Sequence, residues 1–321
     1  MAANSGSAPR PSSDGSPPQM IRRSTLVGLL CLAVGLSACG TTRAPQTALA
    51  APRGEALFPG GHYWREVTTE PARMRVHVLE LDLRRVRLEL TAGDTSKGRE
   101  HVAQTPSDYV RRNDLAAAVN ASYFTPFKGG SKGGDDYYPH AGDGADVSGA
   151  AIAFGRQVSP VEPGEDERVN AILCIKADQV EIIDGQDCGR PVDHAVSAGP
   201  RLLAAGQARS FEAFGRAYGE NRHPRTAIGL DADAPRAWLV VVDGRQPGLS
   251  EGASLNDLIA IFRELGAEDA MNLDGGGSTT LVVRRGGHPV VMNSPIHTGV
   301  PGRERPSANH IGVRVTSEPR P

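Results

Sequence analysis

The stretch 238–293 constrains the fold most, because strand and helix signals follow one another in it, separated only by turns. WLVVVD is an apolar run of strand length that ends at Asp243, and Ser254 and Asp257 then form an S-x-x-D helix start. Apolar residues recur at helical spacing after this start: Leu255, Leu258, Ile259, Phe262 and Leu265. A second strand, DAMNLD, ends at Asp274. Strand, helix and strand in this order predict a right-handed crossover between neighbouring parallel strands.

Both aspartates are expected at one edge of the sheet, because the carboxyl ends of parallel strands meet there and α/β folds bind ligands at that edge. After Asp274, GGGSTTLVVRRGGHPVVMN predicts a glycine turn, a strand, a tight turn and a returning strand. Alternation from Met74 to Leu90 predicts two more strands. We therefore expect an α+β (mixed α/β) fold: a mixed β-sheet core with one β-α-β crossover and flanking hairpins, in a single domain.

Composition supports a turn-rich fold. The 321 residues include 38 Gly and 24 Pro, which argues against a helix bundle, a coiled coil and a polytopic membrane protein. The formal net charge is −2, from 35 Lys plus Arg against 37 Asp plus Glu, so the chain lacks the broad positive charge of a nucleic-acid binder. We expect no nucleic-acid partner.

The segment MIRRSTLVGLLCLAVGLSACG, which starts at Met20, predicts an export signal. It has two arginines, an apolar run too short to span a bilayer comfortably, and small residues before Cys39. Its end, LSAC, resembles the lipobox of bacterial lipoproteins, in which the cysteine is lipidated. The resemblance implies a lipoprotein signal peptide over residues 20–38 and a membrane anchor at Cys39. An ordinary signal peptide cleaved nearby and a single anchor helix are the alternatives.

This signal predicts a protein of the bacterial cell envelope, lipid-anchored and facing the periplasm or the exterior. Residues 1–19 are then a disordered or spurious extension, residues 39–61 a flexible tether, and residues 62–317 the folded domain. Removing residues 1–38 takes away three Arg and one Asp, which leaves 32 basic and 36 acidic side chains and a net charge of −4.

Cys174 and Cys188 are the two cysteines outside the signal, and they flank a turn-like segment, IKADQVEIIDGQD. In an oxidising compartment a disulfide across a hairpin is the expected state. Two free buried cysteines are the alternative, and metal binding is disfavoured because no CxxC or histidine cluster accompanies them.

The turn after the second strand carries the strongest chemical signal. Three glycines can direct backbone N–H groups toward one point and two hydroxyls follow, which predicts a nest for phosphate or another oxyanion. The residues are Asn272, Asp274, Gly275, Gly276, Gly277, Ser278 and Thr279. The turn is neither a P-loop nor a dinucleotide fingerprint, so nucleotide binding is not supported. A flexible hairpin turn is the alternative reading.

ENRHPRTAIGLD forms a second constellation. Pro224 disfavours helix at His223, so Arg225 sits at the entrance of a strand, where its guanidinium is suited to clamp a phosphodiester. The alternatives are a surface arginine paired with a carboxylate and a loop histidine without a chemical role. Two weaker motifs, VNASYF and GRERPSANHIGV, each adjoin a strand and add Asn120, Arg303, Arg305, Asn309 and His310.

An acidic loop leaves the metal question open. Its carboxylates suit Ca²⁺, but the spacing is not that of an EF-hand, which favours a solvated loop; the residues are Asp135, Asp136, His140, Asp143 and Asp146. A divalent cation, Ca²⁺ or Mg²⁺, remains a possible cofactor. Asp243 and Asp274 beside an anion nest and arginines suggest hydrolysis of a substrate that carries both sugar and phosphate, with the two carboxylates as acid and base or nucleophile. The sequence has no G-x-S-x-G elbow.

At these residues the chain resembles the phosphodiester glycosidase family. The matching segments, in family order over most of residues 115–315, are AAVNASYF, SAGPRLL, HPRTAIGLD, LVVVDGRQPGLSEGASLNDLIAIFRELGAEDAMNLDGGGSTTLVV and RPSANHIGV. The resemblance implies hydrolysis between a sugar's anomeric carbon and a phosphodiester, which releases the sugar and leaves a phosphomonoester. The site residues that it implies are Asn120, Arg225, Asp243, Arg245, Asn272, Asp274, Gly275, Gly276, Ser278, Thr279 and Asn309.

Within this implied site, Arg225 and the glycine nest would hold phosphate, and either Asp274 or Asp243 would handle the proton. The chain departs from the family at NASYF, where an NGGYF-like turn is common. The resemblance therefore does not fix the shape of the site at this turn. The expected substrate is a sugar-phosphate glycan or glycolipid of the envelope. The competing hypotheses are a noncatalytic lipoprotein that binds phosphorylated glycan and a metal-dependent phosphodiesterase that cuts the P–O bond.

Overall fold

The computed structural model describes residues 53–125, 134–161, 168–177, 179–232 and 235–317. The expected extension, signal peptide and lipidated Cys39, with most of the tether, lie outside the described residues. Among the residues that are described, no helix is both long and apolar enough to cross a bilayer.

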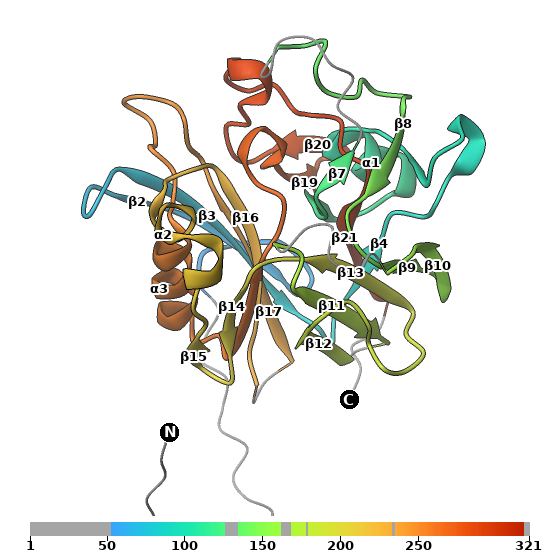
Figure 1. Ribbon diagram of the computed structural model, residues 1–321, viewed down its shortest axis with the longest axis horizontal. Helices are drawn as coiled ribbons and strands as arrows, with labels where there is room; N and C mark the ends of the chain where they lie inside the picture. Colours follow the sequence, from blue (N-terminus) through green and yellow to red (C-terminus); the bar gives the residue numbers. More distant parts are fainter. Residues whose placement is uncertain (1–52, 126–133, 162–167, 178, 233–234, 318–321) are drawn as a thin grey trace, which may run out of the picture. The chain divides into compact units, whose positions relative to one another are not determined.

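Four sheets make up the described chain (Figure 1). The largest has eight strands in the order β1 (Glu55–Phe58), β2 (Gly61–Thr68), β3 (Met74–Asp82), β17 (Arg236–Val242), β16 (Arg225–Leu230), β18 (Asp269–Asn272), β14 (Arg201–Ala204) and β15 (Gln207–Ala208). A five-stranded sheet has the order β20 (His288–Val291), β19 (Leu281–Arg285), β6 (Ala117–Asn120), β21 (His310–Val315) and β4 (Val86–Leu90).

Two smaller groups of strands complete the sheets. One has five strands, β10 (Arg156–Ser159), β9 (Ala151–Ala153), β13 (His194–Ala198), β11 (Ala171–Lys176) and β12 (Gln179–Asp184). The other has three, β5 (His101–Val102), β8 (Gly144–Val147) and β7 (Phe124–Thr125). The helices are α1 (Pro106–Asn113), α2 (Arg216–Glu220) and α3 (Leu255–Leu265), with 3₁₀ turns η1 (Thr95–Lys97), η2 (Glu212–Phe214), η3 (Gly276–Ser278) and η4 (His297–Gly299).

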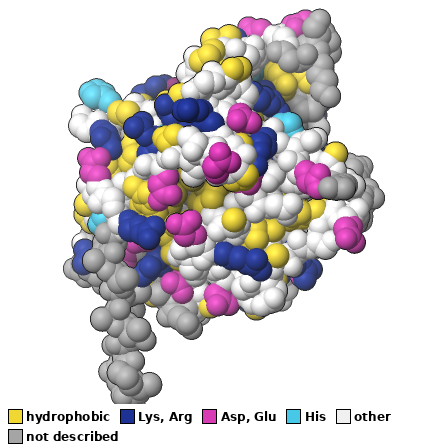
Figure 2. Space-filling model, turned by 90° about the vertical axis from the view of Figure 1, so that its left-hand side faces the viewer, with side chains coloured by type: hydrophobic (Ala, Val, Ile, Leu, Met, Phe, Trp, Pro, Cys, Tyr) yellow, Lys and Arg dark blue, Asp and Glu magenta, His cyan; other side chains and the backbone are white. Residues whose placement is uncertain are grey.

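The central strands β16 and β17 of the eight-stranded sheet are buried on both faces, which explains the continuous apolar run in β17. Val240 and Val242 face a cluster with Leu258 and Phe262 of α3, while Leu239 points into the core shared with the other sheets. Figure 1 shows α2 and α3 together on one side of this sheet. The face turned to the viewer in Figure 2 mixes basic and acidic side chains with apolar areas, in keeping with the small net charge.

The helix signals of the sequence are confirmed. Ser254 and Asp257 form a reciprocal capping box at the start of α3, and Gly266 ends the helix with φ 85°, in the left-handed region that glycine tolerates. Thr105 caps α1 by accepting from the backbone of Asp108.

The α+β class is confirmed, but two details of the expected sheet are wrong. α3 does join two parallel strands, β17 and β18, yet β16 lies between them and is antiparallel to both. Every ladder between the described strands is antiparallel, so the sheet is not mixed. The reason is that β16 and β17 form a hairpin, which places β16 in the gap that the crossover spans.

The fold also begins earlier than the expected His62. β1 pairs with β2, with Ala56 opposite His62, so residues 55–61 belong to the sheet and not to a tether. A strand here covers the edge of β2, which would otherwise present unpaired backbone groups.

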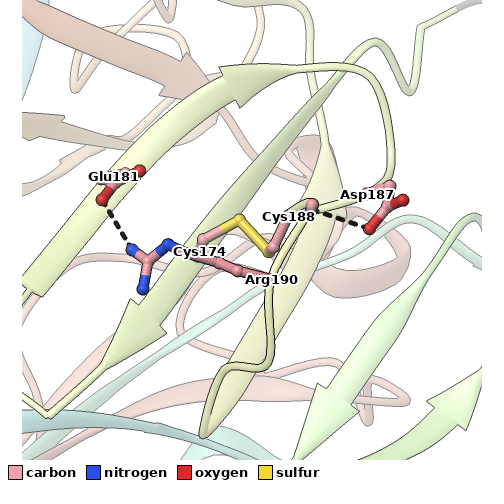
Figure 3. Close-up of a disulfide and its surroundings, with 6 residues drawn as sticks. Cys174, Glu181, Asp187, Cys188 and Arg190 are labelled. Carbon is pink, nitrogen blue, oxygen red and sulfur yellow. Dashed lines mark hydrogen bonds and ion pairs between the residues drawn. A yellow bond between two sulfur atoms is a disulfide. The ribbon is translucent and has the colours of Figure 1, made fainter.

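The expected disulfide and hairpin are confirmed. β11 and β12 form the hairpin, and Cys174 on β11 is bonded to Cys188 just after β12 (Figure 3). Arg190 reaches back to Glu181 on β12, with 2.6 Å between Nη2 and Oε1. The bond therefore ties the segment after the hairpin to its first strand.

Candidate functional site

Asp274 lies where β18 leaves the sheet and the glycine turn begins. Its backbone N–H donates to the carbonyl of Ala121 (2.8 Å), and its carbonyl accepts from Asn120 Nδ2, so the end of β6 holds it in place. The residue is only partly exposed, and burial raises the pKa of its carboxyl to about 6, against the lowering effect of a hydrogen bond with Ser278 and the charges of Arg305 and Arg168. Such a carboxyl can exchange a proton near neutral pH.

The glycine turn does not form the expected nest with its central amides. The N–H groups of Gly276, Ser278 and Thr279 donate to the carbonyls of Pro224, Gly275 and Gly276, at 2.8, 3.2 and 3.3 Å. They are therefore not available to an anion. Gly275 also lies close to the loop before β16, since a Cβ built on it would be 2.7 Å from the Pro224 oxygen.

The glycines instead admit two guanidinium groups. A Cβ on Gly276 would lie 3.2 Å from Arg245 Nη1, and a Cβ on Gly277 would lie 2.1 Å from Arg305 Nη2. A methyl group on Gly277 would displace the Arg305 guanidinium, whereas one on Gly276 would require only a small shift of Arg245. Two guanidinium groups therefore lie against the turn that follows Asp274.

Arg305 is buried and held on three sides. Its Nε donates to His297 Nδ1 (3.1 Å) and its Nη1 to Ser278 Oγ (3.2 Å), while its guanidinium carbon lies 3.7 Å from the ring centre of Tyr138. Burial lowers its pKa, and the carboxyl of Asp274 opposes that effect. The guanidinium therefore keeps a fixed position next to the turn.

Arg245 follows β17 and is exposed, with φ 57° in the left-handed region, which is unusual for a residue with a side chain. Its Nη2 lies 3.4 Å from His223 Nδ1. Burial, together with the charges of Arg225 and Arg245, lowers the pKa of His223 to about 4. The imidazole is therefore neutral at physiological pH.

Arg225, the first residue of β16, is buried and held by backbone carbonyls. Its Nε donates to Ala253 O (3.0 Å) and its Nη2 to Asn221 O (3.1 Å). Burial lowers its pKa, and the charge of Arg245 adds to this effect. Arg225 therefore adds positive charge near Arg245, while its Nε and Nη2 donate to backbone carbonyls and stabilise the fold.

Tyr123 and Asn272 form another side of the site. Asn272 Nδ2 donates to Tyr123 Oη (3.0 Å) and to the carbonyl of Gly199 (2.9 Å), and the Tyr123 hydroxyl donates to the same carbonyl (2.8 Å). The guanidinium of Arg168 lies 4.7 Å from the Tyr123 ring centre. Asn272 Oδ1 is buried and has no hydrogen-bond partner among the described residues.

Three of the expected site residues are buried within the scaffold. Asn120 Oδ1 accepts from Thr226 Oγ1 (2.8 Å) and from the N–H of Thr280 (3.2 Å). Asn309 Oδ1 accepts from the N–H of Ser122 (2.9 Å). These amides tie the ends of β6, β16 and β21 together. The Thr279 hydroxyl is buried and has no partner within the described part of the chain.

Asp243 does not form the expected catalytic pair with Asp274. Its side chain is 0% exposed, and both oxygens are occupied. Oδ2 lies 3.1 Å from His77 Nε2, and Oδ1 accepts from Asn293 Nδ2 (3.2 Å) and from the N–H of Ser294 (2.7 Å). Asp243 therefore ties β3 to the segment after β20, and its carboxylate oxygens already have protein partners.

The carboxylates of the acidic loop contact protein donors. Asp135 Oδ1 pairs with Arg303 Nη2 (2.6 Å), and Asp143 accepts from the N–H of His140. Asp146 pairs with Arg99. Within the described ranges, no three His, Cys, Asp or Glu side chains come together as a metal would require.

Several residues of the site escaped the sequence analysis. Arg305 stood in a motif that was weak by itself, and Tyr123 in another. His297, Tyr138 and Arg168 had no signal, because each reaches the site through a loop with no periodicity. The glycine after Asp274 that could have drawn attention to a neighbour is Gly277, which lies against Arg305.

Comparisons with known proteins agree on family and fold. A family model described as phosphodiester glycosidase matches residues 113–314. The zebrafish N-acetylglucosamine-1-phosphodiester alpha-N-acetylglucosaminidase catalytic domain, auto-inhibited by its pro-peptide, is similar over 83% of this chain and 87% of that chain, with 20% identity and a TM-score of 0.58.

Two bacterial structures are also similar. A hypothetical protein from Synechocystis has 18% identity and a TM-score of 0.51, over 80% of this chain and 62% of that chain. A putative exported protein from Burkholderia pseudomallei has 18% identity and a TM-score of 0.50, over 75% of this chain and 74% of that chain. At these identities the likeness concerns the fold. A search of curated proteins found no match.

Proposed function

The chain belongs to the phosphodiester glycosidase family, and from that premise we propose that it hydrolyses the glycosidic bond of a sugar-1-phosphodiester. The sugar is released and a phosphomonoester remains. The observation that carries the proposal is Asp274, a partly exposed carboxyl whose pKa is raised to about 6, next to a glycine turn on which the Arg245 and Arg305 guanidinium groups lie.

The chemistry of the leaving group fits these residues. A phosphomonoester loses its second proton near pH 6, so it leaves readily and needs stabilisation of its charge more than a strong acid. Guanidinium groups supply that stabilisation through paired N–H donors. Asp274, ionised above pH 6, acts on the opposite side of the bond, as base toward water or as nucleophile toward the anomeric carbon.

We further propose that the substrate is a glycan or glycolipid of the bacterial envelope. The export signal and the lipobox-like LSAC support this location, with Cys39 as the anchor and the protein facing the periplasm or the exterior. The Cys174–Cys188 disulfide is of the kind that persists in oxidising compartments. Cys39→Ser should release the protein from the membrane fraction, and an unchanged distribution would refute the anchor.

The decisive experiment offers the purified protein a panel of sugar-1-phosphodiesters, GlcNAc-1-phosphodiesters included, in isotopically labelled water. We expect a reducing sugar to appear with the label on its anomeric hydroxyl. Label in the phosphate, with loss of activity in chelator, would establish a metal-dependent phosphodiesterase instead. Tight binding without release of sugar from any member of the panel would establish a noncatalytic lipoprotein that binds phosphorylated glycan.

A further inference from the structure

The two arginines on the glycine turn have the same unusual kind of partner. Arg305 Nε donates to His297 Nδ1 at 3.1 Å, and Arg245 Nη2 lies 3.4 Å from His223 Nδ1. Because guanidinium has donors only, each imidazole nitrogen must be the acceptor. Among the described residues, no carboxylate lies within ion-pairing distance of either guanidinium.

Three partly buried arginines of this chain are held by carboxylates instead. Arg222 pairs with Asp257 (2.5 Å) and Arg201 with Asp269 (2.5 Å). Arg314 forms a bidentate ion pair with Glu89, with Nε 2.7 Å from Oε2 and Nη2 2.9 Å from Oε1. A carboxylate partner orients an arginine and also cancels its charge, whereas a neutral imidazole orients it and leaves the charge uncompensated.

The surroundings of both imidazoles keep them neutral. The pKa of His297 is lowered to about 4 by burial and by the charges of Arg305 and Arg303, with His140 adding to the effect and Asp135 opposing it. His223 has its pKa lowered in the same way by burial and by Arg225 and Arg245. A proton on either Nδ1 would face a guanidinium donor. Geometry and charge therefore both favour a neutral imidazole with an unprotonated Nδ1.

The charges of the two arginines act at one place. Their guanidinium groups lie against consecutive residues, Gly276 and Gly277, and the charge of Arg245 contributes to the lowered pKa of Arg305. The carboxyl of Asp274 offsets part of the charge of Arg305, but neither guanidinium has an ion-paired carboxylate among the residues that the structure describes. Two like charges held close together raise the energy of the empty site, and a ligand with two negative charges relieves this repulsion most.

We propose that His223 and His297 are positioning residues that hold Arg245 and Arg305 as a cation pair without an ion-paired carboxylate in the described chain, and that this pair selects a phosphate dianion over a phosphodiester monoanion. The inference rests on the proposed function. As the bond between the anomeric carbon and oxygen breaks, its electron pair moves to the phosphate, whose charge changes from −1 toward −2. Water supplies the new oxygen on the carbon, and Asp274 accepts a proton of that water. The pair therefore stabilises the transition state more than the substrate.

The experiment measures binding of inorganic phosphate and of dimethyl phosphate to the purified protein at pH 8 by calorimetry. We expect phosphate to bind at least about tenfold more tightly than the diester. His223→Gln and His297→Gln keep an acceptor and should stay within about threefold of the parent in phosphate affinity. His223→Glu and His297→Glu add a carboxylate, and each should weaken phosphate binding by about tenfold or more, with a fall in kcat and little change in KM.

His288→Glu is the matched control, because His288 is exposed on β20, and it should leave phosphate affinity unchanged. Thermal unfolding identifies any variant that fails to fold, and if buried His297→Glu does so, the partly exposed His223→Glu decides. Glutamate variants that bind phosphate as tightly as the glutamine variants would overturn the inference, as would equal affinity for the two ligands. Because binding is measured without turnover, the outcome is independent of whether any sugar phosphodiester is hydrolysed.

Discussion

Asp243 and Asp274 occupy equivalent places in the chain and have opposite surroundings. Each follows one of two parallel strands at the same edge of the sheet, and each precedes a glycine. Asp243 is fully buried and both its oxygens have protein partners. Asp274 is partly exposed and its pKa is raised to about 6 by burial.

The difference teaches that a strand-end position does not by itself assign a chemical role. A buried carboxylate whose oxygens all have protein partners contributes to stability through those hydrogen bonds. It has no free oxygen with which to bind a ligand. A carboxyl that the protein leaves poorly solvated costs stability and gains reactivity. Four predictions, made with three variants, test this contrast.

The largest effect is expected from Asp274→Asn. An amide cannot accept a proton or attack carbon, so kcat/KM for a sugar-1-phosphodiester should fall by about a thousandfold or more. Steady-state kinetics measures the loss, and the circular dichroism spectrum should be unchanged. If this variant retains a tenth of the activity, Asp274 is not the reacting group.

Asp243→Asn should show the reverse pattern. The amide oxygen can still accept from Asn293 and the Ser294 N–H, but its NH2 group then faces His77 Nε2. The buried negative charge beside Arg75 is also lost. We expect the free energy of unfolding to fall by about 3 kcal/mol. Denaturant titration measures it, and kcat per folded molecule should stay within a factor of a few. A loss of kcat as large as that of Asp274→Asn would break the contrast.

Gly277→Ala tests whether the turn exists to admit Arg305. The new methyl group would meet the end of the arginine, which must move, so kcat/KM should fall by about ten- to a hundredfold with little change in melting temperature. The control is the same substitution in an Arg305→Ala background, where it should have little further effect. Additive losses in the double variant would show that the glycine acts by another route.

These residues also show how far sequence reasoning reaches. The caps of α3, the Cys174–Cys188 pair and the glycines after Asp274 follow local rules, and each was predictable from a short window. The insertion of β16 between β17 and β18 was not predictable in this way. The hairpin of β16 with β17 competes with the crossover for the same edge of β17, and a short stretch of sequence shows only one of these two pairings.

The site was predictable to a similar extent. Asp274 and Arg225 stand in recognisable motifs, but the occupied oxygens of Asp243 depend on His77 and Asn293, which are far away in sequence. His297 reaches Arg305 from a loop without any pattern. Partners of this kind are set by tertiary packing, which a single sequence does not display.

The smallest expected effect is a pH-dependent gain of stability in Asp274→Asn. The folded-state pKa of about 6 lies above the ordinary value of 3.8, so the folded protein keeps this proton while the unfolded chain loses it. The parent's stability from this group is therefore complete below pH 3.8 and is lost as pH rises through 6. Asparagine does not titrate, so the variant should match the parent near pH 4 and exceed it by about 1–2 kcal/mol at pH 8. Melting temperatures measured across this range test it, and a difference that does not vary with pH would show that the fold does not raise the pKa of Asp274.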